Sequence, residues 1–239
     1  MSLLARLPSW LRRAAPLLSA EQQARLLALP APAAPSDQSL RRQRWVVVDT
    51  ETTGLNLSRD CLLSIGAVVI EDGAIDLGAG FERTLQYSSN KTAPSVLIHG
   101  LSPSALAAGS EPKEALLEFL EFVGDSPLLA FHAWFDQHML GKALKENLGY
   151  KSAHRWLDVA DIAPMLFPDQ VGRLAGLDNW VEHFALHVEE RHHASADALV
   201  TAELCMILFS HARRQGIDSP VLLEDRLNQW RRHQQAPSV

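Results

Sequence analysis

The chain has 239 residues, of which 47% are hydrophobic and 21% charged, proportions typical of a folded globular protein. No run approaches the ~20 apolar residues of a membrane span, and arginines interrupt the apolar N-terminus, so we expect no membrane partner, no signal core and a cytoplasmic location. Residues 1–44 carry seven arginines against two acids, a charge of +5, so the remainder of the −6 chain carries −11. Two distant cysteines in apolar runs, Cys61 and Cys205, predict core thiols and no disulfide or zinc framework.

The first part of the chain predicts an extension. Leucines at helical spacing indicate amphipathic helices in residues 1–30, with a cap at Ser19, and the Pro/Ala-rich residues 31–43 predict a semi-rigid linker that does not pack. The extension has three possible roles: docking on the body, binding a protein partner, or contacting nucleic-acid phosphates through its arginines.

The main domain is predicted over residues 44–214, followed by a C-terminal helix and tail over residues 215–239. A β-branched strand begins at Trp45, further strands are expected over 61–70 and 74–85, and a hairpin turn at 71–73 joins them. Helices are expected over 95–101, 111–123, 135–148, 177–187, 194–214 and 221–232, with a short strand at 127–131. Residues 156–158 begin another strand or helix. This order predicts an α/β domain with a mixed sheet.

The first strand ends in two carboxylates, Asp49 and Glu51. Side chains on a strand alternate, so these two point to the same face, where burying both unpaired would be costly. A hard divalent cation resolves the repulsion, and the small-residue turn after Thr52 lets the backbone approach a ligand closely. The alternative is a solvated strand end with two unrelated acids.

Three later residues extend this set. Asp136 follows an apolar strand in the first turn of a predicted helix, where capping is the alternative role. Asp197 lies among small apolar residues of a helix and needs a counter-charge or a cation. His192 would lie about 140° around that helix from Asp197, so we expect it on the preceding loop. Four carboxylates and a histidine suit two-metal phosphodiester hydrolysis with a histidine base.

Three segments, residues 47–55, Phe135-Asp136 and His192-x-Ala194-x-x-Asp197, resemble the motifs of the DEDDh family of 3′→5′ exonucleases, which are similar to the proofreading subunit of bacterial DNA polymerase III. The resemblance covers about residues 44–212. It implies a ribonuclease-H-like fold and two divalent ions, Mg²⁺ or Mn²⁺. It also implies a role for each matching residue: Asp49, Glu51, Asp136 and Asp197 as metal ligands, His192 as general base, and Thr52, Thr53, Gly54, Leu55, His99 and Phe135 at the terminal nucleotide.

One position departs from the family pattern, because His132 replaces the usual asparagine of the second motif. An imidazole still forms hydrogen bonds, so the departure affects the positioning of Asp136 and not the ligand set. Nearby acids and aromatics receive structural roles: Asp158 and Asp161 are interpreted as helix N-caps, and Trp134, Trp156 and Trp180 as core residues, although stacking on bases is the alternative for the tryptophans.

The sequence therefore predicts a metal-dependent 3′→5′ exonuclease that acts on single-stranded nucleic-acid ends, DNA before RNA, and releases nucleoside 5′-monophosphates. Three alternatives remain open: an RNA-directed exonuclease of the same family, a docking module that binds a polymerase or another protein through residues 1–30, and a metal phosphatase or pyrophosphatase acting on small molecules.

Overall fold

The computed structural model of the chain describes residues 16–87, 101–188 and 192–235. Five strands form one mixed sheet in the order β3-β2-β1-β4-β5, in which β3, β2 and β1 are antiparallel and β1, β4 and β5 are parallel. The strands are β1 Trp45–Thr52, β2 Leu62–Glu71, β3 Ala74–Thr84, β4 Leu128–Ala130 and β5 Trp156–Asp158. The predicted mixed α/β architecture is confirmed.

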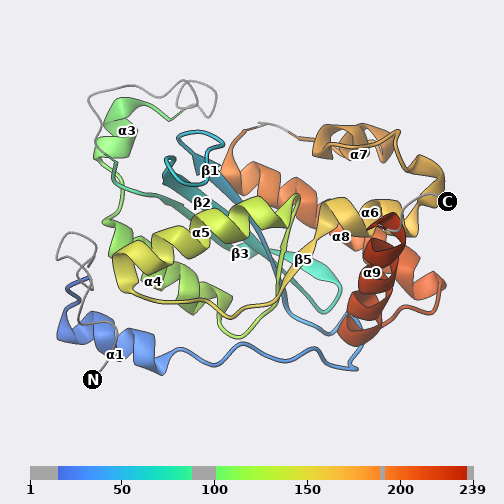
Figure 1. The fold of residues 1–239 in the computed structure, drawn as a ribbon, viewed down its shortest axis with the longest axis horizontal. Coiled ribbons are helices and arrows are strands. Elements are labelled where there is room, and N and C mark those ends of the chain that lie inside the picture. Colours follow the sequence, from blue (N-terminus) through green and yellow to red (C-terminus); the bar gives the residue numbers. More distant parts are fainter. Residues whose placement is uncertain (1–15, 88–100, 189–191, 236–239) are drawn as a thin grey trace.

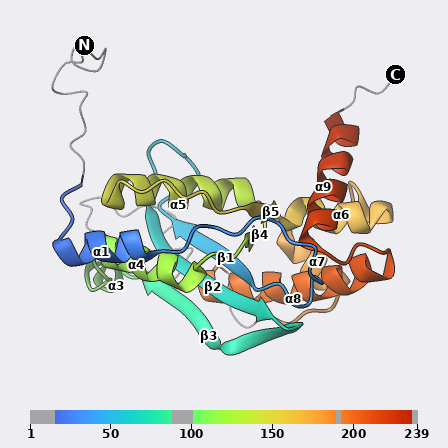
Figure 2. The ribbon, with the colours of Figure 1, turned by 90° about the horizontal axis from the view of Figure 1, so that it is seen from below.

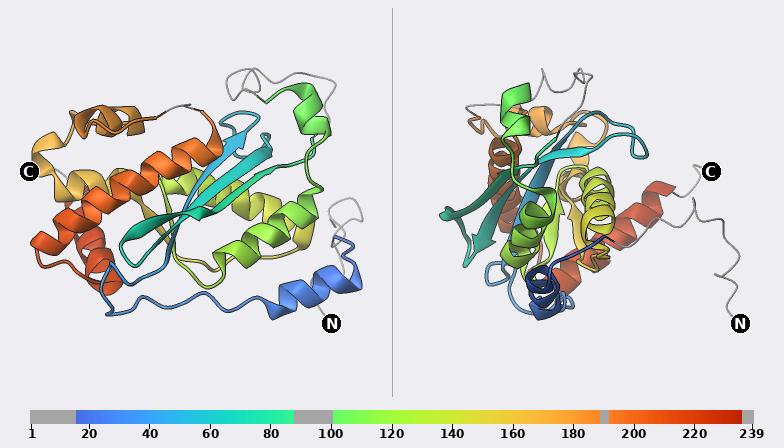
Figure 3. Two further views of the ribbon diagram at one scale, coloured as in Figure 1. Left: turned by 180° about the vertical axis from the view of Figure 1, so that it is seen from behind. Right: turned by 90° about the vertical axis from the view of Figure 1, so that its left-hand side faces the viewer.

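Helices cover both faces of this sheet (Figures 1 and 2). They are α1 Ala20–Ala28, α3 Pro103–Ala107, α4 Pro112–Val123, α5 Ala133–Leu148, α6 Val159–Leu166, α7 Leu177–His183, α8 Ala194–Arg214 and α9 Pro220–Gln235, with a 3-10 turn at Pro168–Gln170. Helices α4 and α5 lie on one face, and α8 crosses the opposite face, as the view from behind in Figure 3 shows. The sheet is therefore the middle of three layers.

The alternation of side chains along β1 divides the core between these layers. Trp45 and Val47 pack in the cluster that includes α6, α8 and α9, while Val46 and Val48 pack in the cluster that includes α4 and α5. All four side chains are at most 1% exposed. A strand buried on both faces leaves no solvated side, so the acids at its end lie next to two hydrophobic cores.

The extension docks on the body through α1, which lies beside α4 (Figure 1). Arg25 forms ion pairs with Glu114 at 2.6 Å and with Glu121 at 2.7 Å, and Leu26 packs against the adjoining core. These pairings raise the pKa of the Arg25 guanidinium and lower the pKa of the Glu121 carboxyl. The pKa of Glu114 is lowered mainly by the hydrogen bond from Gln22 and then by the one from Arg25. Of the three roles considered for the extension, docking on the body is thus observed for α1.

The linker also packs, contrary to expectation. The backbone N–H of Ala33 donates to the carbonyl of Asp125 at 2.9 Å, and Val221 N–H donates to the carbonyl of Ser36 at 3.4 Å. Proline removes donors from this segment but leaves its carbonyls and the intervening N–H groups available to the body. A second correction concerns Cys61, which is exposed just before β2, whereas Cys205 is buried in α8 as expected.

Several helix boundaries differ from those predicted. Helix α5 begins two residues earlier than expected, at Ala133, and α7 ends at His183 because Ala185 adopts a left-handed backbone with φ of 52°. Helices α3 and α6 were not predicted, and the helix expected over residues 95–101 lies almost wholly outside the described residues. Within the described part of the chain, only α8 has the length and apolar composition of a candidate membrane span, and 56% of that window is buried inside the protein.

Candidate metal centre

Strand β1 presents Asp49 and Glu51 on one face, as its period of two predicts. Asp49 is half-buried and pairs across the sheet with Gly66, while Glu51 is 6% exposed and pairs with Ser64. The register shifts between Glu51 and Thr52, so the ladder is disrupted directly after the second acid. The strand thus ends where its carboxylates reach the edge of the core.

Helix α8 brings the third carboxylate to these two. Asp197 lies in its first turn and is 6% exposed. The helix start packs directly on β2 because Gly66 has no side chain: a Cβ there would lie 2.2 Å from the carbonyl carbon of Ala194. Carboxylate oxygens of Asp49, Glu51 and Asp197 lie within 4.8 Å of one another, a spacing that suits the oxygen ligands of a divalent cation.

Asp136 lies on the other side of β1. It is buried near the start of α5, and its Oδ1 accepts a hydrogen bond of 2.7 Å from the hydroxyl of Thr50, whose side chain points away from the face of Asp49 and Glu51. Among the described residues, the acidic cluster therefore contains three of the four carboxylates that the resemblance implies.

Burial dominates the electrostatics of Asp136. Desolvation raises the pKa of its carboxyl from 3.8 to about 7, against the hydrogen bonds from Thr50 and from backbone N–H groups, which lower it, and the charge of Asp158 raises it slightly further. The pKa of Asp158 is also raised, mainly by burial. Asp136 consequently takes up a proton near neutral pH, unlike an ordinary surface carboxylate.

His192 lies on the loop that leads into α8, where the sequence placed it. It is exposed and has a left-handed backbone with φ of 65°, and its N–H donates to Asp197 Oδ2 at 3.2 Å. The neighbouring His193 is differently engaged, because its ring contacts Ser195 Oγ at 3.0 Å and Glu82 Oε1 at 3.4 Å. Of the two histidines, the one that the motif spacing selects is thus exposed, and its backbone N–H contacts the acidic cluster.

The turn after β1 is held by hydrogen bonds that the sequence did not reveal. Asp60 accepts from Thr53 Oγ1 at 2.8 Å and from the N–H of Asn56 at 2.7 Å, and Lys142 of α5 donates to the carbonyl of Asp60 at 2.7 Å. Thr52 Oγ1 donates to the carbonyl of Gly54 at 2.8 Å. The available signal for Asp60 was an acidic residue at the end of the turn, just before the next strand. Its hydrogen bonds hold in place the segment that is predicted to bind the terminal nucleotide.

The remaining residues predicted at the terminal nucleotide have different surroundings. Leu55 is 83% exposed at the tip of the turn, and the half-buried Phe135 contacts Trp134 edge-on with ring centroids 5.9 Å apart. His99 lies outside the described residues, so its role stays a prediction.

The residues given structural roles are partly corrected. Asp158 does cap α6, accepting from Ala160 N–H at 3.0 Å, and it also accepts from His132 N–H at 3.0 Å. Asp161 is not a cap: it lies inside α6 and pairs with Arg231 at 2.6 Å. His132 precedes α5 in a left-handed conformation with φ of 62°, a region in which asparagine and histidine are both enriched.

The three tryptophans interpreted as core residues differ in their burial. Trp180 is fully buried and Trp156 is partly buried, but Trp134 is 58% exposed, so core packing is the wrong role for it. It occupies the second position of α5 and lines a cavity at the surface of the protein.

Comparisons with known proteins place the chain in a family. The family model for exonucleases (RNase_T) matches residues 46–205. The PolC-type DNA polymerase III of Thermotoga petrophila is 31% identical over 181 residues, which are 76% of this chain and 13% of that protein. Its Bacillus subtilis counterpart is 25% identical over 198 residues, 82% of this chain and 14% of that protein. The chain thus spans a small part of these polymerases.

Solved structures agree on the fold. A crystal structure of E. coli exonuclease I in complex with a dA16 oligonucleotide is similar with a TM-score of 0.64 at 13% identity, covering 77% of this chain and 42% of that one. The ribonuclease-H-like fold that the sequence resemblance implies is therefore confirmed. Because the exonuclease model covers well over half of the sequence, including Asp49, Glu51, Asp136 and Asp197, the chain belongs to the exonuclease family, as one of the DnaQ-like 3′→5′ exonucleases.

Proposed function

We propose that this protein is a metal-dependent 3′→5′ exonuclease that removes nucleoside 5′-monophosphates from single-stranded DNA. The observation that carries the proposal is the convergence of Asp49, Glu51 and Asp197 within 4.8 Å beside an exposed histidine, His192. Three clustered carboxylates without a cation would repel one another, whereas carboxylate oxygens are the preferred ligands of Mg²⁺ and Mn²⁺.

Each residue then has a distinct task. Asp49, Glu51 and Asp197 hold the ions, and Asp136 joins them as a ligand once it is deprotonated. When bound, two divalent ions offset the negative charge of the reacting phosphate and of the attacking and leaving oxygens. His192, exposed beside Asp197, takes the proton of the attacking water through its ring nitrogen. The turn from Thr52 to Leu55 positions the terminal sugar and base.

DNA is favoured as substrate because the names of the similar proteins refer to DNA. The relatives are DNA polymerases of the PolC type, and the similar exonuclease I structure holds a deoxyadenosine oligonucleotide. Discrimination against RNA depends on contacts to the 2′ position, so the RNA-directed alternative requires a direct comparison of substrates.

The test is digestion of matched single-stranded DNA and RNA oligomers labelled at the 5′ end, with Mg²⁺, with Mn²⁺ and with EDTA. We expect a metal-dependent ladder that shortens from the 3′ end, faster for DNA. Asp197→Asn, which removes one negative charge at nearly constant shape, should abolish the ladder while the circular dichroism spectrum stays that of the parent protein.

The same assay decides among the alternatives. A faster RNA ladder would make the protein an exoribonuclease, and hydrolysis of a mononucleotide ester without any ladder would indicate a phosphatase. A folded protein that cleaves neither substrate with either metal would refute the proposal in favour of a docking module.

A further inference from the structure

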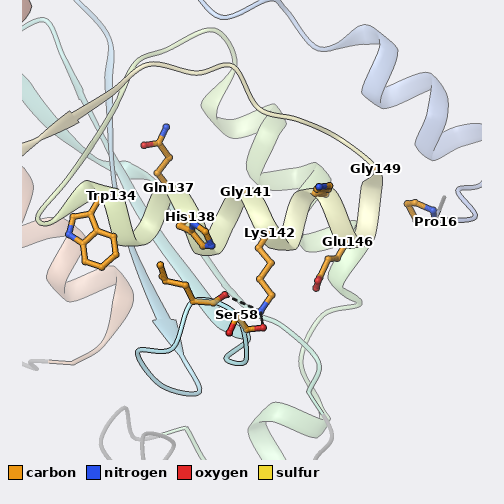
Figure 4. A pocket seen from close by; sticks show the side chains of 11 residues that line it. Pro16, Ser58, Trp134, Gln137, His138, Gly141, Lys142, Glu146 and Gly149 are labelled. Atoms are coloured by element: carbon orange, nitrogen blue, oxygen red, sulfur yellow. Dashed lines mark hydrogen bonds between the residues drawn. The ribbon is translucent and has the colours of Figure 1, made fainter. Parts of the chain in front are cut away.

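The outer face of α5 carries a row of aromatic and basic side chains. Trp134, His138, Lys142 and Lys145 follow one another at intervals of three or four residues, so they share one face of the helix. They line a cavity of about 910 Å³ whose opposite wall contains Leu57 and Ser58. Figure 4 shows Trp134 at one end of this groove and Pro16 at the other, with Lys142 reaching across to Ser58.

One end of the groove lies at the start of α5, the helix that carries Asp136, against the turn after β1. Strands β1 and β4 are parallel with Val47 opposite Leu129, so residue 131 is level with Asp49. Helix α5 starts two residues later, and Trp134 is its second residue. The groove therefore begins near the ends of β1 and β4, at the level of Asp49 along the strands, and leads away along α5.

The opposite wall is anchored by Lys142. Its amine donates to the carbonyls of Ser58 at 3.2 Å and Asp60 at 2.7 Å, which ties the turn after β1 to α5. Lys142 therefore joins the two walls of the groove, and its amine is occupied by hydrogen bonds to backbone carbonyls. Lys145, one turn further on, is exposed at the groove, where Glu146 also contributes an acidic side chain.

Single-stranded nucleic acid is recognised by this combination of groups. Exposed aromatic rings stack on bases without regard to sequence, and basic side chains along a groove follow the phosphates. Trp134 offers such a ring at 58% exposure, in a groove whose two walls are joined by the hydrogen bonds of Lys142. The ring of Trp134 and the exposed amine of Lys145 thus give the groove one site for a base and one for a phosphate.

We propose that the α5 groove, defined by Trp134, His138, Lys142 and Lys145, holds the nucleotides upstream of the scissile bond in a single strand. A base stacks on Trp134 and a phosphate pairs with Lys145, while the 3′ end enters the acidic cluster. This inference rests on the proposed exonuclease function, which supplies the direction of the strand.

The length of the groove makes the proposal quantitative. Eleven residues separate Trp134 from Lys145, which is about 16 Å at ~1.5 Å per residue. A stacked strand rises ~3.4 Å per nucleotide, so the groove accommodates about five nucleotides. The Michaelis constant should therefore fall with oligomer length up to roughly six nucleotides and change little beyond.

The experiment compares single-stranded DNA oligomers of two, four, six and twelve nucleotides in steady-state digestion. Trp134→Ala should raise KM for the twelve-nucleotide substrate by at least about fivefold, with a much smaller change in kcat. Trp134→Phe, which keeps an aromatic face, should restore most of the affinity. Lys145→Ala should raise KM. It should also reduce the slope of log KM against log salt concentration by about one, the amount expected for the loss of one phosphate contact. Leu222→Ala, at an exposed residue of α9 outside the groove, is the matched control.

A second measurement separates this inference from the proposed function. Binding of a 5′-fluorescent twelve-nucleotide DNA is followed by anisotropy in EDTA, where no cleavage is expected. Weaker binding by Trp134→Ala than by the parent protein supports the groove even if no preparation cleaves DNA. Equal binding and an unchanged length dependence in Trp134→Ala would overturn it, and would leave the groove to a protein partner.

Discussion

Replacing Asp136 with asparagine should stabilise the metal-free protein above neutral pH. The carboxyl group of Asp136 is buried with a pKa of about 7, against 3.8 ordinarily, so the folded protein holds its proton more tightly than the unfolded chain does. The stability that this proton contributes is fully present below pH 3.8 and is lost as the pH rises through 7. Between pH 5 and pH 7 that loss spans two pH units, or about 3 kcal/mol at ~1.36 kcal/mol each. Asparagine resembles the protonated acid in shape, carries no charge and can still accept from Thr50 Oγ1.

The assay is urea denaturation in EDTA at pH 5, 6, 7 and 8. The unfolding free energy of the parent protein should fall relative to that of Asp136→Asn by about 3 kcal/mol across this range, with most of the loss complete by pH 7. Asp158 has a raised pKa as well, so the variant should retain part of the pH dependence. Parallel curves for the two proteins would refute the assignment of a protonated, buried Asp136.

Three other substitutions test neighbouring parts of the argument. His192→Ala should lower kcat by roughly 10²- to 10⁴-fold with the Mg²⁺ concentration for half-maximal rate unchanged, and an undiminished rate at neutral pH would remove it as the base. Gly66→Ala should destabilise the protein by about 1–3 kcal/mol in thermal denaturation because α8 must shift, whereas Gly80→Ala, with no atom within 4 Å of the added carbon, is its control. Arg25→Ala should accelerate amide hydrogen exchange in α1 while changing global stability by no more than about 1 kcal/mol; unchanged exchange in α1 would show that apolar packing alone holds it.

Sequence patterns within a single segment correctly predicted the strands β1 to β3 and the helix α8. A run of valines and a glycine hairpin identify β1 to β3, and the long apolar segment of α8 identifies a helix. Helix α6 was missed because it is only eight residues long and contains Pro164, a residue that argues against a helix interior. Docking of the linker was missed because its backbone hydrogen bonds join it to residues near 125 and 221, which no local pattern links to it.

The site was predictable as a set of residues but not as a geometry. Alternation along one strand is enough to place Asp49 and Glu51 together, and the structure agrees. Gly66 and Thr50 were missed because each acts on a partner distant in sequence, one by admitting α8 and the other by holding Asp136. A glycine within an apolar strand often marks close backbone approach, which was the available signal for Gly66. Trp134 was assigned to the core because helical position alone does not say which face the rest of the chain covers.

The two sides of β1 explain why Asp136 behaves differently from the other three acids. Thr50 and Asp49 are adjacent in sequence and so point to opposite faces, and Asp136 is bonded to the first of them. A carboxylate must lose its proton to become a metal ligand, so recruiting Asp136 costs free energy below pH 7 that recruiting an ordinary acid does not. Metal affinity measured by calorimetry should therefore rise between pH 6 and pH 8. In the parent protein, metal binding at pH 6 should release close to one proton from Asp136, and Asp136→Asn should release fewer protons. Identical proton release in both would mean that the ions are held by Asp49, Glu51 and Asp197 alone.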